Sequence, residues 1–283
     1  MAKDASDVKV KRSVPSEPSP SKRSRRKPNK SEKTLRTVMK RHRHKQGVVV
    51  SSRVHPGEAQ SSWVVQGLIN FLLSEDPVAV QLRSQFVFKV VPMLNPDGVV
   101  YGNYRCSLLG LDLNRRWHDP SKTLDPTVFF TKRLLKVLQE EREVLAFFDL
   151  HGHSRKKNAF MYGCEHSGAD ARKRNFMLRA LPALFGAESR IFKFDHCSFK
   201  CEKAKEKTGR LVCFKELGVR HSFTLETSFY GREREEEDAA DADMHMGVGE
   251  FEKLGEELCK TIWHYQQKEY LDELEYEASK FEY

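Results

Sequence analysis

Short apolar runs alternate with amphipathic stretches through most of the chain, and this alternation predicts the elements of the fold. Runs of β-branched and aromatic residues, typical of buried strands, occupy residues 47–54, 85–94, 144–150 and 221–226, with a further strand expected within 191–199. Apolar positions at helical spacing predict helices over residues 61–73, 127–142, 169–185 and 245–266. Alternating strands and helices favour an α/β fold with a mixed, mostly parallel sheet flanked by helices.

Charge is distributed unevenly along the 283 residues, with a basic first segment and an acidic last one. Residues 1–46 hold 16 Lys and Arg against 4 Asp and Glu and no aromatic residue, so we expect a disordered basic tail. Residues 47–266 are predicted to be the folded domain. Residues 232–283 hold 6 basic against 17 acidic residues, and we expect 267–283 to be an acidic tail of helical character.

Several classes of protein are excluded by what the sequence lacks. No apolar run approaches the roughly 18 residues of a membrane span, and the N-terminus has no apolar signal segment. The six cysteines form no CxxC pair, so we expect a cytoplasmic protein with reduced thiols. The basic clusters at residues 22–27 and 40–45 are typical of nuclear import or of contact with polyanions, but also of a solvated tail without a partner.

Polar residues with metal-binding chemistry follow three of the predicted strands. His55 and Glu58 lie three residues apart after the first strand, and His151 follows the strand at 144–150. Two imidazoles and one carboxylate suit a zinc site whose fourth position stays open for water. Glu226 ends another apolar strand, where a carboxylate is suited to act as a general base. Because the carboxyl ends of strands meet in one crevice of an open α/β sheet, we expect these residues to lie together.

A second set of residues has chemistry suited to binding a carboxylate. Arg105, Asn114 and Arg115 fall within a short polar segment, and guanidinium groups bind carboxylates through two parallel hydrogen bonds. A charged surface loop is the alternative explanation, and it is the one we expect for Arg53 and Arg116. Taken singly, His55, Glu58, His151 and Glu226 also have ordinary structural explanations as surface pairs, packed residues or partners of a helix dipole.

Eight motifs, taken in order, resemble the cytosolic carboxypeptidases, the deglutamylase branch of the zinc carboxypeptidase superfamily. They are HPGE, NPDGV, NYRC, DLNRRW, FFDLHGHSRKKN, MYGC, TGR and FTLE, and the resemblance runs from about residue 47 to about residue 265. It implies a zinc carboxypeptidase-like catalytic domain over residues 47–266 with one Zn²⁺ per chain. The implied metal ligands are His55, Glu58 and His151.

The same resemblance implies a role for each remaining candidate. Glu226 would deprotonate the zinc-bound water, and Arg105 would polarise the scissile carbonyl. Asn114 and Arg115 would hold the terminal carboxylate of the substrate. The chain departs from the pattern in two ways: Ala204 stands where secreted relatives carry a mobile tyrosine, and the basic tail stands where the family's domain has further strands. We therefore expect a sheet that lacks its N-terminal strands.

Charge within the predicted domain bears on the substrate. Residues 47–231 hold 27 basic against 19 acidic residues, and a positive crevice favours acidic chains. This agrees with what the resemblance implies, namely removal of glutamate from acidic or polyglutamylated protein C-termini such as tubulin tails, in the cytosol and in association with microtubules or cilia. Arg210, expected in a loop, is the candidate contact for the acidic side chain.

Two alternatives to this enzyme remain open. The first is an inactive truncated paralogue that binds acidic tails or nucleic acid through its basic segments. Nucleic acid is the less favoured of these two partners because the tail has no aromatic residue on which bases could stack. The second is an acylase-like zinc amidohydrolase. No membrane partner is expected, and the sequence gives no oligomeric state.

Overall fold

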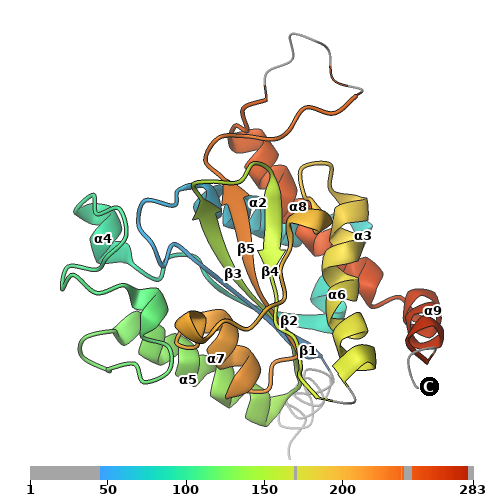
Figure 1. Ribbon diagram of the computed structural model, residues 1–283, viewed down its shortest axis with the longest axis horizontal. Coiled ribbons are helices and arrows are strands. Elements are labelled where there is room, and N and C mark those ends of the chain that lie inside the picture. Colours follow the sequence, from blue (N-terminus) through green and yellow to red (C-terminus); the bar gives the residue numbers. More distant parts are fainter. Residues whose placement is uncertain (1–44, 169–170, 237, 239–243, 280–283) are drawn as a thin grey trace, which may run out of the picture. The chain divides into compact units, whose positions relative to one another are not determined.

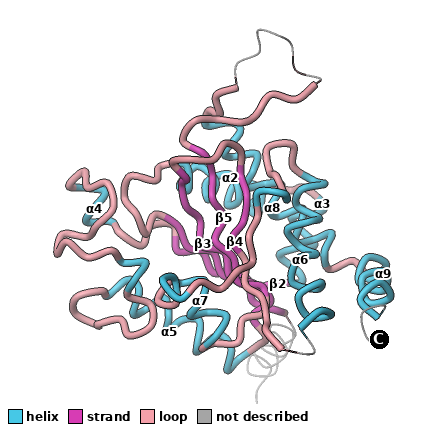
Figure 2. The backbone as a smooth tube through the Cα atoms, viewed as in Figure 1, coloured by secondary structure: helices cyan, strands magenta, loops and turns pink. Residues whose placement is uncertain are grey.

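A five-stranded sheet forms the centre of the fold (Figures 1 and 2). The computed structural model describes residues 45–168, 171–236, 238 and 244–279. Of the basic tail predicted over residues 1–46, residues 1–44 lie outside this part, and Gln46 is already the first residue of a strand. The strands are β1 (Gln46–Ser52), β2 (Phe86–Val91), β3 (Val144–His153), β4 (Ala159–Tyr162) and β5 (His221–Ser228). Their order in the sheet is β2-β1-β3-β5-β4. Strands β2, β1, β3 and β5 are parallel to one another, and β4 is antiparallel to β5. This arrangement confirms the predicted mixed, mostly parallel sheet.

Helices cover both faces of this sheet, as Figure 2 shows. The helices are α2 (Gln60–Leu73), α3 (Pro77–Gln85), α4 (Pro96–Val100), α5 (Pro126–Glu141), α6 (Ala171–Glu188), α7 (Gly209–Lys215), α8 (Val248–Tyr265) and α9 (Lys268–Ser279). Alternate strand residues such as Val50, Phe148 and Leu225 point into a large apolar core shared with α2, α6 and α8. Val49 and Phe147, on the opposite face, pack into a second core with α5 and α7. No helix in the described part of the chain is long and apolar enough to span a membrane.

Two glycines allow the backbones of α2 and α8 to touch. A Cβ atom on Gly255 would lie 2.1 Å from the carbonyl oxygen of Val64, and one on Gly67 would lie 1.9 Å from that of Glu252. Only hydrogen fits at these distances. The tight crossing fixes α2, whose N-terminus follows the loop that carries His55 and Glu58.

The predicted elements and the observed ones differ in a few places. The strand expected within residues 191–199 was wrong: this segment contains a short 3₁₀ helix at Phe194–His196 and touches β4 only through isolated bridges at Phe192 and Ser198. The 3₁₀ turn between these two bridges interrupts the extended backbone that a continuous ladder would need. Three helices, α3, α4 and α7, and the four-residue strand β4 are elements that the apolar pattern did not predict.

Candidate metal centre

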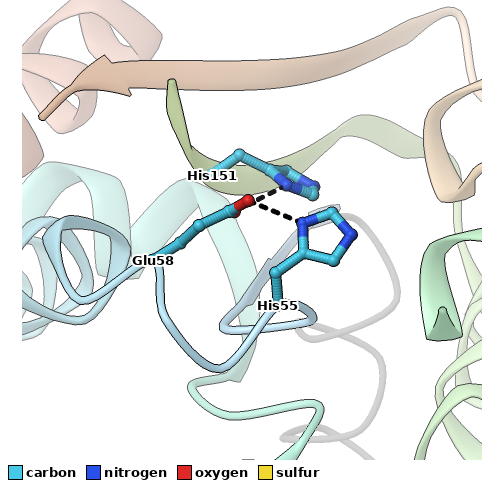
Figure 3. Close-up of side chains that lie close together, drawn as sticks. All are labelled: His55, Glu58 and His151. Atoms are coloured by element: carbon cyan, nitrogen blue, oxygen red, sulfur yellow. Dashed lines mark hydrogen bonds and ion pairs between the residues drawn. The ribbon is translucent and has the colours of Figure 1, made fainter. Parts of the chain in front are cut away.

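Three side chains converge where β1 and β3 end, and Figure 3 shows them. His55 and Glu58 lie in the loop between β1 and α2, and His151 lies near the end of β3. The Glu58 carboxylate sits between the two rings, with Oε1 2.7 Å from His55 Nδ1 and Oε2 3.0 Å from His151 Nδ1. All three residues are buried, and one ligand atom from each lies within 4.8 Å of the others. The structure thus brings together the three predicted zinc ligands.

The outer nitrogen of each histidine meets a second carboxylate. His55 Nε2 lies 3.1 Å from Asp112 Oδ1, and His151 Nε2 lies 2.8 Å from Asp149 Oδ2. Asp149 also accepts a hydrogen bond of 2.7 Å from the Ser51 hydroxyl. A proton on Nε2 donated to a carboxylate leaves the Nδ1 lone pair free for a metal and fixes the plane of the ring. Both rings therefore present Nδ1 to the common centre.

The electrostatics of the cluster favour a positive charge at its centre. Burial alone would raise the pKa of Glu58, but the charges and hydrogen bonds of His151 and His55 hold this pKa well below its usual range. Burial would likewise lower the pKa of His151, yet the carboxylates of Asp149 and Glu58 raise it well above the ordinary value. Glu58 is thus ionised at neutral pH, and two carboxylates flank His151. Such a negative, buried pocket suits a divalent cation with nitrogen and oxygen ligands.

Backbone contacts hold the loop that carries His55 and Glu58. Arg53 has a left-handed backbone (φ 52°), and its guanidinium group donates to the Pro56 carbonyl at 3.0 and 2.7 Å and to the Ser62 hydroxyl at 2.8 Å. The expectation that Arg53 is a surface arginine was therefore wrong. Gly57 donates its N–H to the Tyr104 carbonyl at 2.8 Å, and a Cβ atom there would lie 2.8 Å from the same oxygen. These contacts fix the loop's path before α2 begins.

Glu226 lies beside the three-residue cluster. It is directly opposite His151 in the parallel register of β3 and β5 and is half-buried. Burial raises the pKa of its carboxyl to about 7; the charges of His151 and His55 lower this pKa, while Glu58 and Asp149 raise it further. A carboxyl group with a pKa near neutrality can both accept and return a proton.

The predicted carboxylate-binding residues lie on both sides of Asp112 in the sequence: Arg105 in the loop before it, and Asn114 and Arg115 in the short 3₁₀ helix that follows it. Arg105 donates to Asp112 Oδ2, with Nε at 3.0 Å and Nη2 at 2.8 Å. Arg115 Nη1 lies 3.8 Å from the same oxygen, and Asn114 Nδ2 lies 3.4 Å from His151 Nε2. The side-chain oxygen Oδ1 of Asn114 accepts a hydrogen bond of 3.0 Å from the Gly209 N–H, which joins this segment to α7. Asp112 thus connects both arginines to the histidine cluster.

Arg116, the neighbour of these residues, has a structural contact. Its Nε donates at 3.0 Å to Asp125, which is fully buried at the start of α5. Arg116 therefore lies in a loop, as expected, but its guanidinium group also neutralises the buried carboxylate of Asp125.

Arg210 lies in the first turn of α7 and is 5% exposed, so its expected place in a loop was wrong. Its Nη1 donates to the Gly163 carbonyl and lies 3.9 Å from Cys164 Sγ. The guanidinium carbon is 5.9 Å from the centre of the Tyr162 ring. Among the described residues no carboxylate pairs with Arg210. A buried cation without an anionic partner is a candidate for binding an anionic ligand.

Sequence reasoning missed the two aspartates that orient the histidines. Asp112 stands in the DLNRRW motif and Asp149 in FFDLHGH, so both lay within segments already singled out. The pairing of His55 with Asp112 does not follow from spacing, because these residues are 57 positions apart, but the pairing of His151 with Asp149 does. An aspartate two residues before a metal-binding histidine on a strand was the available signal, because residues i and i+2 share a face.

The geometry defines a metallohydrolase-type site: a candidate metal centre with a carboxyl group beside it, at the carboxyl end of an α/β sheet. Residues 23–261 match the zinc carboxypeptidase family. The chain is 45% identical over 219 residues to mouse (Mus musculus) cytosolic carboxypeptidase 2 and 42% identical over 228 residues to Xenopus laevis cytosolic carboxypeptidase 1. Each match covers 77% of this chain, but only 24% and 18% of those relatives, respectively. The chain therefore belongs to the zinc carboxypeptidase family, in its cytosolic carboxypeptidase branch.

A solved structure agrees with this assignment. The metallo-carboxypeptidase from Burkholderia cenocepacia superposes with a TM-score of 0.67 at 26% identity, over 78% of this chain and 57% of that one. Zinc is the metal of the family, and the donor set of His55, Glu58 and His151 fits it. Two imidazoles oriented by carboxylates, each neutral once a metal displaces any proton from Nδ1, plus one ionised glutamate supply three of zinc's usual four ligands and leave one position open.

Proposed function

We propose that this chain is a zinc metallocarboxypeptidase that removes glutamate from acidic or polyglutamylated protein C-termini. The observation that supports it most directly is the position of Glu226 opposite His151, one strand away from the cluster formed by His55, Glu58 and His151. A metal centre with a carboxyl group of raised pKa beside it is an arrangement suited to hydrolysis of a peptide bond by a metal-activated water.

Glu226 is the proton-transfer group in this proposal. Zinc, when bound, lowers the pKa of a coordinated water and polarises the scissile carbonyl. Glu226 accepts a proton from the attacking water and passes it to the leaving amine. Its pKa of about 7 suits both steps near neutral pH, because a base of matched pKa transfers protons in both directions. The carboxylates of Asp112 and Asp149 keep the two histidine rings in position throughout.

Arg105, Asn114 and Arg115 bind the substrate backbone in this proposal. Arg105 stabilises negative charge on the scissile carbonyl oxygen, since a preorganised cation beside a developing oxyanion lowers the barrier. Asn114 and Arg115 hold the terminal carboxylate, which restricts cleavage to the last residue of a chain. Arg105 and Arg115 share Asp112 as a partner and are both partly exposed, so the substrate can replace that contact.

Arg210 supports glutamate as the preferred residue. It is buried without a carboxylate partner in the described part of the chain, and the segment leading into α7 carries exposed lysines at positions 200, 203, 205 and 207. A positive approach raises the local concentration of acidic tails and disfavours basic ones. Tubulin-like tails in the cytosol are therefore the proposed substrates, with association at microtubules or cilia.

Zinc binding and release of the last residue test this proposal together. Purified protein is stripped with a chelator, reloaded with zinc, and incubated with two peptides that differ only in ending in glutamate or lysine. We expect zinc-dependent release of glutamate and little release of lysine. His151→Ala should lose zinc and activity, while His264→Ala, on α8 and away from the centre, should keep both. Zinc binding without release from either peptide would favour the inactive binding protein instead.

A further inference from the structure

One tyrosine on β4 stands on the same sheet face as the candidate centre. In the antiparallel register of β4 and β5, Tyr162 is opposite Thr224 and Phe160 is opposite Glu226. Directly opposed residues, and residues two positions apart on one strand, point to the same face of a sheet. Tyr162 therefore shares a face with Glu226, and through the β3 register with His151.

The Tyr162 side chain lies beside Arg210, and its strand β4 is at the edge of the sheet. The Arg210 guanidinium carbon is 5.9 Å from the ring centre, and Arg210 Nη1 donates to the carbonyl of Gly163, the next residue after Tyr162. Tyr162 and Arg210 are thus neighbours, and Tyr162 is opposite Thr224, which is buried on the same face. Both side chains carry hydrogen-bond donors.

The Tyr162 hydroxyl has no partner within the described part of the chain, although the residue is half-buried. A phenol hydroxyl that makes no hydrogen bond within the protein is free to donate one to water or to a ligand. Burial raises the pKa of Tyr162, and the charge of Glu226 raises it further, while Arg210 lowers it. The phenol therefore keeps its proton at neutral pH and is available as a donor.

We infer that Tyr162 is a specificity-determining residue that donates a hydrogen bond to the side-chain carboxylate of the terminal substrate residue, beside Arg210. This inference rests on the proposed function. Arg210 supplies a positive charge for the substrate's carboxylate. Tyr162 supplies a hydrogen-bond donor at a fixed position, and a neutral or shorter substrate side chain accepts this hydrogen bond less well.

The test compares Tyr162→Phe with wild type on two peptides that end in glutamate or glutamine. These terminal residues are nearly isosteric and differ in charge. Because hydrogen bonds to charged groups are the stronger ones, we expect kcat/KM for the glutamate peptide to fall about tenfold, mainly through KM. The value for the glutamine peptide should change less than about twofold. Tyr101→Phe, on an exposed turn, is the matched control and should leave both values unchanged.

A binding measurement separates this inference from the proposed function. Calorimetric titration of zinc-loaded protein with L-glutamate and L-glutamine needs no turnover. Wild type should bind glutamate more tightly than glutamine, and Tyr162→Phe should reduce the ratio of the two Kd values about tenfold. Absence of hydrolysis with this preference intact would overturn the proposed activity alone. An equal loss for both ligands, no change on substitution, or no preference in wild type would overturn the role of Tyr162.

Discussion

The Nε2 atom of His151 lies 2.8 Å from the Asp149 carboxylate, and Asp149 is itself held by the Ser51 hydroxyl at 2.7 Å. This pair makes His151 a fixed ligand, because the hydrogen bond to Asp149 holds the plane of the ring and keeps a proton on Nε2, which leaves Nδ1 as the nitrogen that a metal can bind. The three residues come from neighbouring strands, with Ser51 opposite Asp149 in the register of β1 and β3. The sheet therefore orients the candidate ligand directly.

Replacement of Asp149 by asparagine tests this arrangement. Asp149→Asn keeps the side-chain volume but removes the charge, so we expect zinc affinity to fall about 10- to 100-fold. Competition with a chromophoric chelator measures the Kd. Asp112→Asn, the equivalent change at His55, should give a loss of similar size, and Asp195→Asn, in the segment 194–196 outside the cluster, should give none. Unchanged affinity in both variants would show that the outer carboxylates do not orient the ligands.

Neighbouring arginines give a prediction that separates substrate binding from stability. Arg115→Ala should raise KM for a peptide with a free C-terminus about 10-fold or more, since charge-assisted hydrogen bonds are worth about 1.5–3 kcal/mol. Its free energy of unfolding should barely change, because the side chain is partly exposed. Arg116→Ala should instead lower the free energy of unfolding by about 1–3 kcal/mol and leave KM unchanged, because it leaves the buried Asp125 carboxylate without its cationic partner. A reversal of these two effects would contradict the assignment.

Two glycines of α8 make a matched pair for stability. A Cβ atom at position 255 would lie 2.1 Å from the Val64 carbonyl oxygen and 2.6 Å from the Leu68 nitrogen, so Gly255→Ala must push α2 and α8 apart. We expect a loss of about 1–3 kcal/mol in urea unfolding. A Cβ atom on Gly249 would meet nothing within 4 Å, and Gly249→Ala should cause no loss. Equal stability of the two variants would argue against the close crossing.

Because of His221, at the start of β5, the stability of the folded protein should depend on pH. Burial, and next the charge of Arg220, lower its pKa to about 3, while its Nε2 lies 3.1 Å from the Tyr265 hydroxyl. The folded state thus holds the ring neutral, whereas the unfolded chain binds a proton below about pH 6.5. The contribution of neutral His221 to the free energy of unfolding is fully present above pH 6.5 and is lost progressively as the pH falls toward 3.

Urea unfolding at pH 7.5 and pH 5.0 measures this effect. Wild type should lose about 2 kcal/mol more than His221→Gln between these two pH values, because 1.5 pH units below the unfolded pKa are worth that amount. Taking the difference between the two proteins cancels the titration of all other groups. An identical pH dependence in both would mean that His221 is not held neutral in the folded protein.

The sequence predicted the parts of the fold that apolar runs specify. The strands near residues 46–52, 144–153 and 221–228 were found because consecutive β-branched and aromatic residues leave no other stable arrangement. Strand β4 was missed because four residues are too short for a periodic signal, and α7 because its helical turn follows a lysine-rich segment. The segment 191–199 has apolar residues suited to a strand but pairs only at isolated points.

The candidate site was predictable in its residues but not in its contacts. His55, Glu58 and His151 follow from motif chemistry and resemblance, and the structure places them together. The contacts of Asp112 with His55, and of Tyr162 with Arg210, join segments 57 and 48 residues apart and depend on how the strands pair. Such pairings are set by register and by helix packing, which local sequence does not encode.

Glutamate release by wild type and by Glu226→Gln tests the central claim most directly. Both proteins are loaded with zinc, their metal content is quantified, and each is incubated with a peptide that ends in several glutamates. Because a positioned base contributes about 10²- to 10⁴-fold in rate, the variant should release glutamate at least about 100-fold more slowly. It should bind as much zinc as wild type, since Glu226 is not among the three predicted metal ligands. Equal release by both proteins, or no release by wild type with zinc bound, would contradict the account.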